Sequence, residues 1–168
     1  MNLPQALRAL SVIAAAFTLS NCATSAPHAT FVTPLTAVVC QGDRVSTQVS
    51  TTDARMSEGE RMMLADRITQ NVQALAQPGG ARHSYELVVN ITRYTKGSGV
   101  VRTAMPGMGQ MHVDGVVTIY QMPKHVPMGE FIVRKSFAIG GIYGLTVNMD
   151  KINAAFAEGV AKTVCQVR

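Results

Sequence analysis

The sequence has few charged residues and does not concentrate them. Lys, Arg, Asp and Glu make up 15% of the 168 residues, and the net charge of +5 is spread along the chain. Aromatic residues are only 5% of the chain and do not alternate with basic residues in a stripe. Proteins that bind nucleic acids usually gather positive charge on one face. The composition therefore argues against nucleic acid as a partner.

The short motifs that mark many catalytic and metal sites are also missing. The chain has no His-Glu-x-x-His sequence and no Cys/His spacing typical of zinc sites. The glycines at 97–99 and 140–144 lack the Lys-Ser/Thr ending of a phosphate-binding loop. His112 and Asp114 share one face of a predicted strand, but no nucleophile motif accompanies them, so they could equally be solvated surface residues. We therefore predict that the protein is not an enzyme.

The apolar run near the N-terminus is too short to span a membrane. It covers the 11 residues 9–19, whereas a spanning helix needs about 20. A short segment ending at Arg8 precedes this run and small residues follow it, which is the order of a secretory signal. Leu19-Ser20-Asn21-Cys22 then resembles the bacterial lipoprotein signal, in which the Cys is acylated and the chain is cut before it. Asn21 departs from the small residue that is usual there.

Two processing routes follow from this pattern. Acylation of Cys22 predicts a signal peptide at 1–21, a flexible tether at 22–34 and a single domain at 35–168. Cleavage at 23–25 would instead discard Cys22 and release a soluble periplasmic protein. Ala23 resembles signals sorted to the outer membrane, so we expect a lipid anchor on the periplasmic face of that membrane.

Either route leaves one pair of cysteines, Cys40 and Cys165, in an oxidising compartment. An even pair predicts a disulfide, which would be worth roughly 4 to 5 kcal/mol in the chain-entropy model because it closes a long loop. The alternative is two separate buried thiols. Neither residue belongs to a Cys-x-x-Cys motif, which argues against a thioredoxin-like role.

Hydrophobic periodicity predicts an α+β domain. Ser57-x-x-Glu60 is a capping box, and the apolar residues after it recur at helical spacing until Pro78. A second helix is expected from Asn148 or Asp150 to the C-terminus. Alternating patterns predict strands at 45–50, 85–92, 111–119 and 131–139, and 36–40 is expected to be a buried first strand. We predict an antiparallel sheet of four to five strands with two helices on one face.

Methionine is unusually dense at residues 105–112. Met105, Met108 and Met111 lie three residues apart and His112 follows, a set of soft ligands that suits Cu(I). Methionine also fills irregular gaps in cores and forms adaptable contact surfaces. A contact loop, ordinary packing and a copper site are therefore all open. We expect no cofactor, and copper is the alternative.

From Tyr85 onward the sequence resembles a family of small bacterial envelope lipoproteins that carry a domain of unknown function. The resemblance rests on residues 85–94, Lys96-Gly97, Val101-Arg102, Gly107 with Gly109, and 113–120. The family implies an α+β lipoprotein domain and no activity, cofactor or catalytic residue. We therefore expect a non-catalytic binding or structural module with an envelope protein as its partner, and a periplasmic copper-binding protein is the alternative.

Overall fold

A computed structural model describes residues 26–53, 55–79, 82–98, 100–101, 109–137 and 147–166. The predicted signal peptide, Cys22, Met105 and Met108 lie outside these residues. No helix in the described part of the chain has the length and apolar character needed to cross a membrane.

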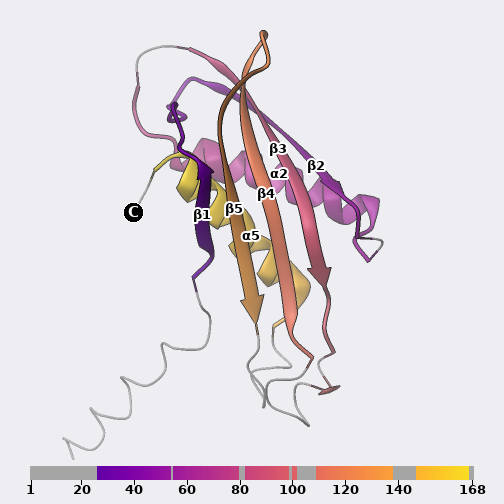
Figure 1. Ribbon diagram of the computed structural model, residues 1–168. Helices are drawn as coiled ribbons and strands as arrows, with labels where there is room; N and C mark the ends of the chain where they lie inside the picture. The colour runs from indigo at the N-terminus through magenta and orange to yellow at the C-terminus, as the bar shows by residue number, and fades with distance from the viewer. Residues whose placement is uncertain are drawn as a thin grey trace, which may run out of the picture.

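Five strands form one sheet, in the order β1-β5-β4-β3-β2 (Figure 1). The strands are β1 (His28–Thr33), β2 (Arg44–Thr51), β3 (Ser84–Thr95), β4 (Met111–Met122) and β5 (Val126–Phe137), and the helices are α2 (Glu58–Leu75) and α5 (Met149–Val164). The α+β prediction is confirmed. The sheet is mixed, however, because β2 runs parallel to β3 while every other pair is antiparallel. A helix between two adjacent strands returns the chain to the end where it started, and α2 does this between β2 and β3.

The outer strand β1 occupies residues that the sequence analysis assigned to the flexible tether. It pairs with β5, and Ala29 joins the apolar cluster under the helices. Just before β1, Pro27 lies so close to α5 that a Cβ on Gly159 would come within 2.6 Å of it. Gly159 thus allows this segment to pack against the helix. The prediction of a first strand at 36–40 is wrong, because only Cys40 forms a bridge there, to Gln77.

Both helices pack on the same face of the sheet, as predicted. The capping box of α2 is present, and Leu64, Ile68 and Val72 bury its apolar stripe. Asn148 caps α5 by accepting a hydrogen bond from the Lys151 backbone N–H. Among the residues that the structure describes, the core between helices and sheet is apolar apart from two buried polar residues, Lys135 and Asn153.

Candidate functional site

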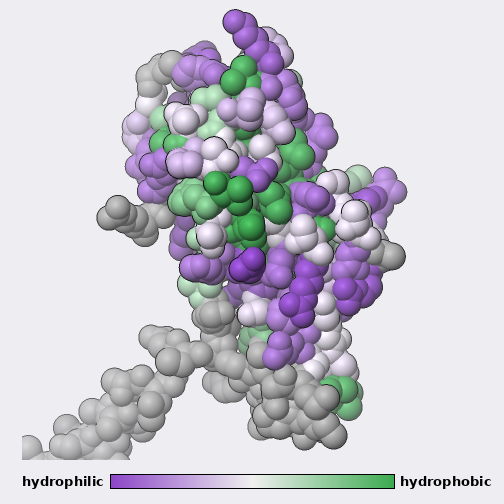
Figure 2. Space-filling model, viewed as in Figure 1, coloured by the Kyte–Doolittle hydropathy of each residue, from purple (hydrophilic) through white to green (hydrophobic). Residues whose placement is uncertain are grey.

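The face of the sheet opposite the helices is polar with a small apolar centre. In the view of Figure 1 both helices lie behind the sheet, so this outer face points toward the viewer. Val88, Val116 and Ile132 form its centre on β3, β4 and β5, and all three are half-buried. Figure 2 shows hydrophobic surface in the middle of this face with hydrophilic side chains around it. A mixed surface of this kind suits contact with another protein.

At one end of the outer face, the β4–β5 hairpin folds its side chains onto the sheet. The His125 ring stacks on Tyr120 with centroids 3.9 Å apart, and its Nε2 lies 3.4 Å from Glu86 Oε2. Gln48 donates to the other oxygen of Glu86 at 2.6 Å. These contacts connect the hairpin to β3 and β2. Sequence analysis did not identify this group, because its members come from three strands.

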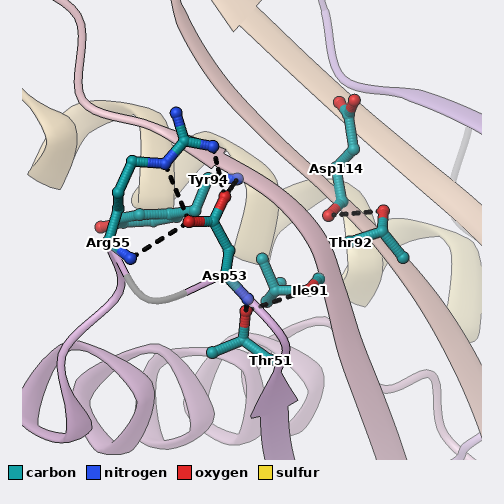
Figure 3. Close-up of polar contacts among 7 residues, drawn as sticks. All are labelled: Thr51, Asp53, Arg55, Ile91, Thr92, Tyr94 and Asp114. Carbon is teal, nitrogen blue, oxygen red and sulfur yellow. Dashed lines mark hydrogen bonds and ion pairs between the residues drawn. The ribbon is translucent and has the colours of Figure 1, made fainter.

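At the opposite end, the Asp53 carboxylate pairs with the β3 backbone beyond the last residue of β2. β2 pairs with β3 only as far as Ile91, and Thr51 Oγ1 donates to the Ile91 carbonyl at 3.0 Å (Figure 3). The Asp53 carboxylate then accepts from the Tyr94 backbone N–H at 3.0 Å and from Arg55 Nε at 2.8 Å. Bonds from the Arg55 side chain and from the backbone N–H groups of Arg55 and Tyr94 hold the pKa of Asp53 well below its ordinary value. Asp53 therefore satisfies a donor that β2 no longer reaches.

The Glu60 carboxylate joins the same end of β3 to α2, and the Tyr94 hydroxyl extends this contact to α5. It accepts from the Ser57 backbone N–H at 2.8 Å, from the Tyr94 hydroxyl at 3.1 Å and from Lys96 Nζ at 3.0 Å. Burial raises the pKa of Glu60, but hydrogen bonds from Ser57, Lys96 and Tyr94 outweigh it and lower the pKa to about 2. The buried Tyr94 hydroxyl also accepts from Asn153 Nδ2 at 3.2 Å. Together with Asp53 and Arg55, these residues form what we term the polar junction.

The polar junction holds secondary-structure elements together, and its ionisable groups are not set up for proton transfer. Burial raises the pKa of Tyr94 to about 12, and the charge of Glu60 adds to the effect of burial. Tyr94 therefore keeps its proton, and Asp53 and Glu60 stay ionised, throughout the neutral range. None of these three groups is poised to exchange a proton near neutral pH, which is what a general acid or base requires.

The candidate metal residues Met111 and His112 point to opposite sides of β4. Met111 is 1% exposed and faces the core, whereas His112 lies on the outer face and contacts Gln110 Oε1 at 2.9 Å. Burial lowers the pKa of His112, helped by the charge of Arg93 and opposed by Asp114. Met111 and His112 therefore do not form a common ligand set in this structure. Because Met105 and Met108 lie outside the described residues, the copper site stays a prediction.

Cys40 and Cys165 are free thiols in this structure. Cys40 lies beside the end of α2, where it forms its bridge to Gln77, and the Cys165 thiol contacts the Val72 carbonyl of the same helix at 3.6 Å. Burial, with a smaller contribution from the nearby Cys40, raises the pKa of Cys165 to about 11. The two cysteines thus lie at the same end of α2, and their disulfide stays a prediction.

An apolar groove of about 480 Å³ lies between the segment around β1 and the last turn of α5. Phe31, which is 52% exposed, and Leu35 line one side, and Lys162 and Thr163 line the other. Among the described residues that line this groove, Lys162 is the only one with a titratable side chain.

The chain matches no family model and no curated protein, but it aligns with solved structures. The PelC dodecamer from Paraburkholderia phytofirmans aligns with a TM-score of 0.57 and 10% identity, over 84% of this chain and 99% of the PelC chain. A candidate lipoprotein from Caulobacter crescentus CB15 aligns with a TM-score of 0.40 and 10% identity, over 71% of this chain and 85% of that one. A Xanthomonas campestris protein of family DUF330 gives 0.42 and 10%, over 79% and 90%.

At 10% identity and a TM-score of 0.57, the likeness to PelC shows a shared fold and nothing more. The PelC match covers almost the whole PelC subunit.

Proposed function

We propose that this chain is a non-catalytic, lipid-anchored protein of the bacterial envelope, and that its domain binds a protein partner through the outer face of the sheet. The observation that carries the proposal is the short distance in sequence between the lipoprotein-type signal and the domain. The first strand begins at His28, only six residues after Cys22. The likeness to PelC supports only the protein-binding part of the proposal, because PelC forms a dodecamer.

The anchor is tested by replacing its attachment site. Cys22→Ser removes the thiol that would carry the lipid and leaves the domain unchanged. We expect the wild-type protein in the membrane fraction of cells and the Cys22→Ser variant outside it. Recovery of the wild-type protein in the soluble periplasm would contradict the proposal and favour cleavage at 23–25.

The binding face is tested separately. Val116→Glu introduces a charge at the apolar centre, and its half-buried position on the outward side of β4 keeps the substitution away from the core. Ser46→Glu, on the exposed outward side of β2, is the matched control. We expect crosslinking in intact cells to join the wild-type protein and Ser46→Glu to a stoichiometric protein partner, a second copy included, and Val116→Glu to lose the partner. Equal crosslinking in all three proteins would exclude this face.

A further inference from the structure

We propose that one end of the sheet, the end that carries Val100 and Val101, rests on the surface of the bilayer that holds the lipid anchor. We term it the Val100 end; here β3 finishes at Thr95 and β4 begins at Met111. The opposite end, where the turn between Met122 and Val126 joins β4 to β5, is the hairpin end. This inference rests on the proposed acylation of Cys22.

The direction of β1 supports this orientation. β1 begins with His28 opposite Arg134 and ends with Thr33 opposite Glu130. Since β5 runs from Val126 at the hairpin end to Phe137 at the Val100 end, β1 starts nearer the Val100 end and runs away from it (Figure 1). A chain that comes from the membrane therefore enters the sheet on its Val100 side.

The length of the connection favours the Val100 end over the hairpin end. The six residues from Cys22 to His28 span roughly 20 Å when fully extended. From the His28–Arg134 pair, three residues of β5 lead to Phe137, roughly 10 Å away, and eight lead back to Val126, roughly 26 Å away. The connection can therefore bring the Val100 end to the bilayer, but it is too short to bring the hairpin end there.

The surface at the Val100 end suits a lipid interface. Val100 is 76% exposed, more than any other large hydrophobic residue in the described part of the chain, and Val101 is 37% exposed. Exposed Arg93 and Arg134 flank Asp114 on the adjoining part of the outer face, so cations outnumber carboxylates in that row. Apolar side chains beside cations are the combination that binds to anionic lipid surfaces.

The absence of Trp from the chain allows a direct test with single Trp reporters. Val100→Trp places the reporter at the proposed contact. Val126→Trp is the matched control, because Val126 is also exposed, at 43%, but lies at the hairpin end. Each full-length acylated variant is reconstituted into phosphatidylcholine–phosphatidylglycerol vesicles, with or without bromine on the acyl chains, and vesicle flotation is measured together with Trp emission.

We expect both variants to float with the vesicles and brominated lipid to quench Val100→Trp at least twofold more than Val126→Trp, with a blue-shifted emission for Val100→Trp only. Flotation with equal quenching of the two reporters, or with stronger quenching of Val126→Trp, would overturn the proposed orientation and leave the anchor intact. Failure of both proteins to float would instead overturn the anchor.

Discussion

Replacing Tyr94 with Phe tests whether the polar junction holds the helices to the end of β3. The hydroxyl of Tyr94 donates to Glu60 and accepts from Asn153, and Phe keeps the buried ring while it removes both bonds. Glu60 still accepts from Ser57 and Lys96 in the variant. Asn153 is therefore the partner that Tyr94→Phe affects most.

The expected magnitude follows from the burial of Asn153. This residue is 8% exposed, and no donor among the described residues reaches its Oδ1. Tyr94→Phe also leaves its Nδ2 without the hydroxyl, and a buried donor without an acceptor costs about 1 to 3 kcal/mol. We expect the free energy of unfolding to fall by about 2 kcal/mol in urea denaturation, with an unchanged m-value.

A double-mutant cycle separates this mechanism from a general packing effect. The Asn153→Leu variant has no side-chain amide that could lose its partner. In this background Tyr94→Phe should therefore lower the free energy of unfolding by at least about 1 kcal/mol less than it does in the wild-type protein. Tyr120→Phe, on the outer face, is the control and should change stability by less than about 0.5 kcal/mol. An equal cost of Tyr94→Phe in both backgrounds would refute the reasoning.

Three further predictions concern acid stability, the cysteines and the packing of α5. Against the effect of burial, hydrogen bonds lower the pKa of Glu60 from 4.5 to about 2, so its contribution is complete above about pH 4.5 and is lost as the pH falls toward 2. Glu60→Gln should flatten that part of the stability profile in acid denaturation, and an unchanged slope would exclude the linkage. Protein purified from an oxidising envelope should contain a Cys40–Cys165 disulfide in a non-reducing peptide map, whereas recovery of two free thiols would contradict it. Gly115→Ala should cost about 1 to 3 kcal/mol in urea denaturation, because its Cβ would lie 3.0 Å from Phe156, and a neutral result would show that the ring moves aside.

Local patterns gave the sequence analysis its accurate predictions. The Ser57–Glu60 capping box is a contact over three residues, and the alternation in β3, β4 and β5 follows from the period of a strand with one buried face. The other partners of Glu60, Tyr94 and Lys96, lie 34 and 36 residues away. No periodicity encodes that distance, so the polar junction could not be predicted from the sequence.

The outer strand β1 illustrates the same limit. Five of its six residues are exposed, and His28, Ala29, Thr30 and Thr33 are polar or small, which is equally typical of a tether. What makes them a strand is the free edge of β5, about 100 residues later in the chain. The parallel pairing of β2 with β3 likewise depends on the path of α2, which a strand pattern does not specify.

The intact mass of the mature protein extracted from membranes shows whether Cys22 carries the lipid anchor. We expect a chain that begins at Cys22 and is heavier than its sequence by a diacylglycerol and, where the amine is also acylated, a further fatty acid. A mass equal to that of an unmodified chain, whether it begins within 23–26 or at Met1, would contradict the proposed anchor.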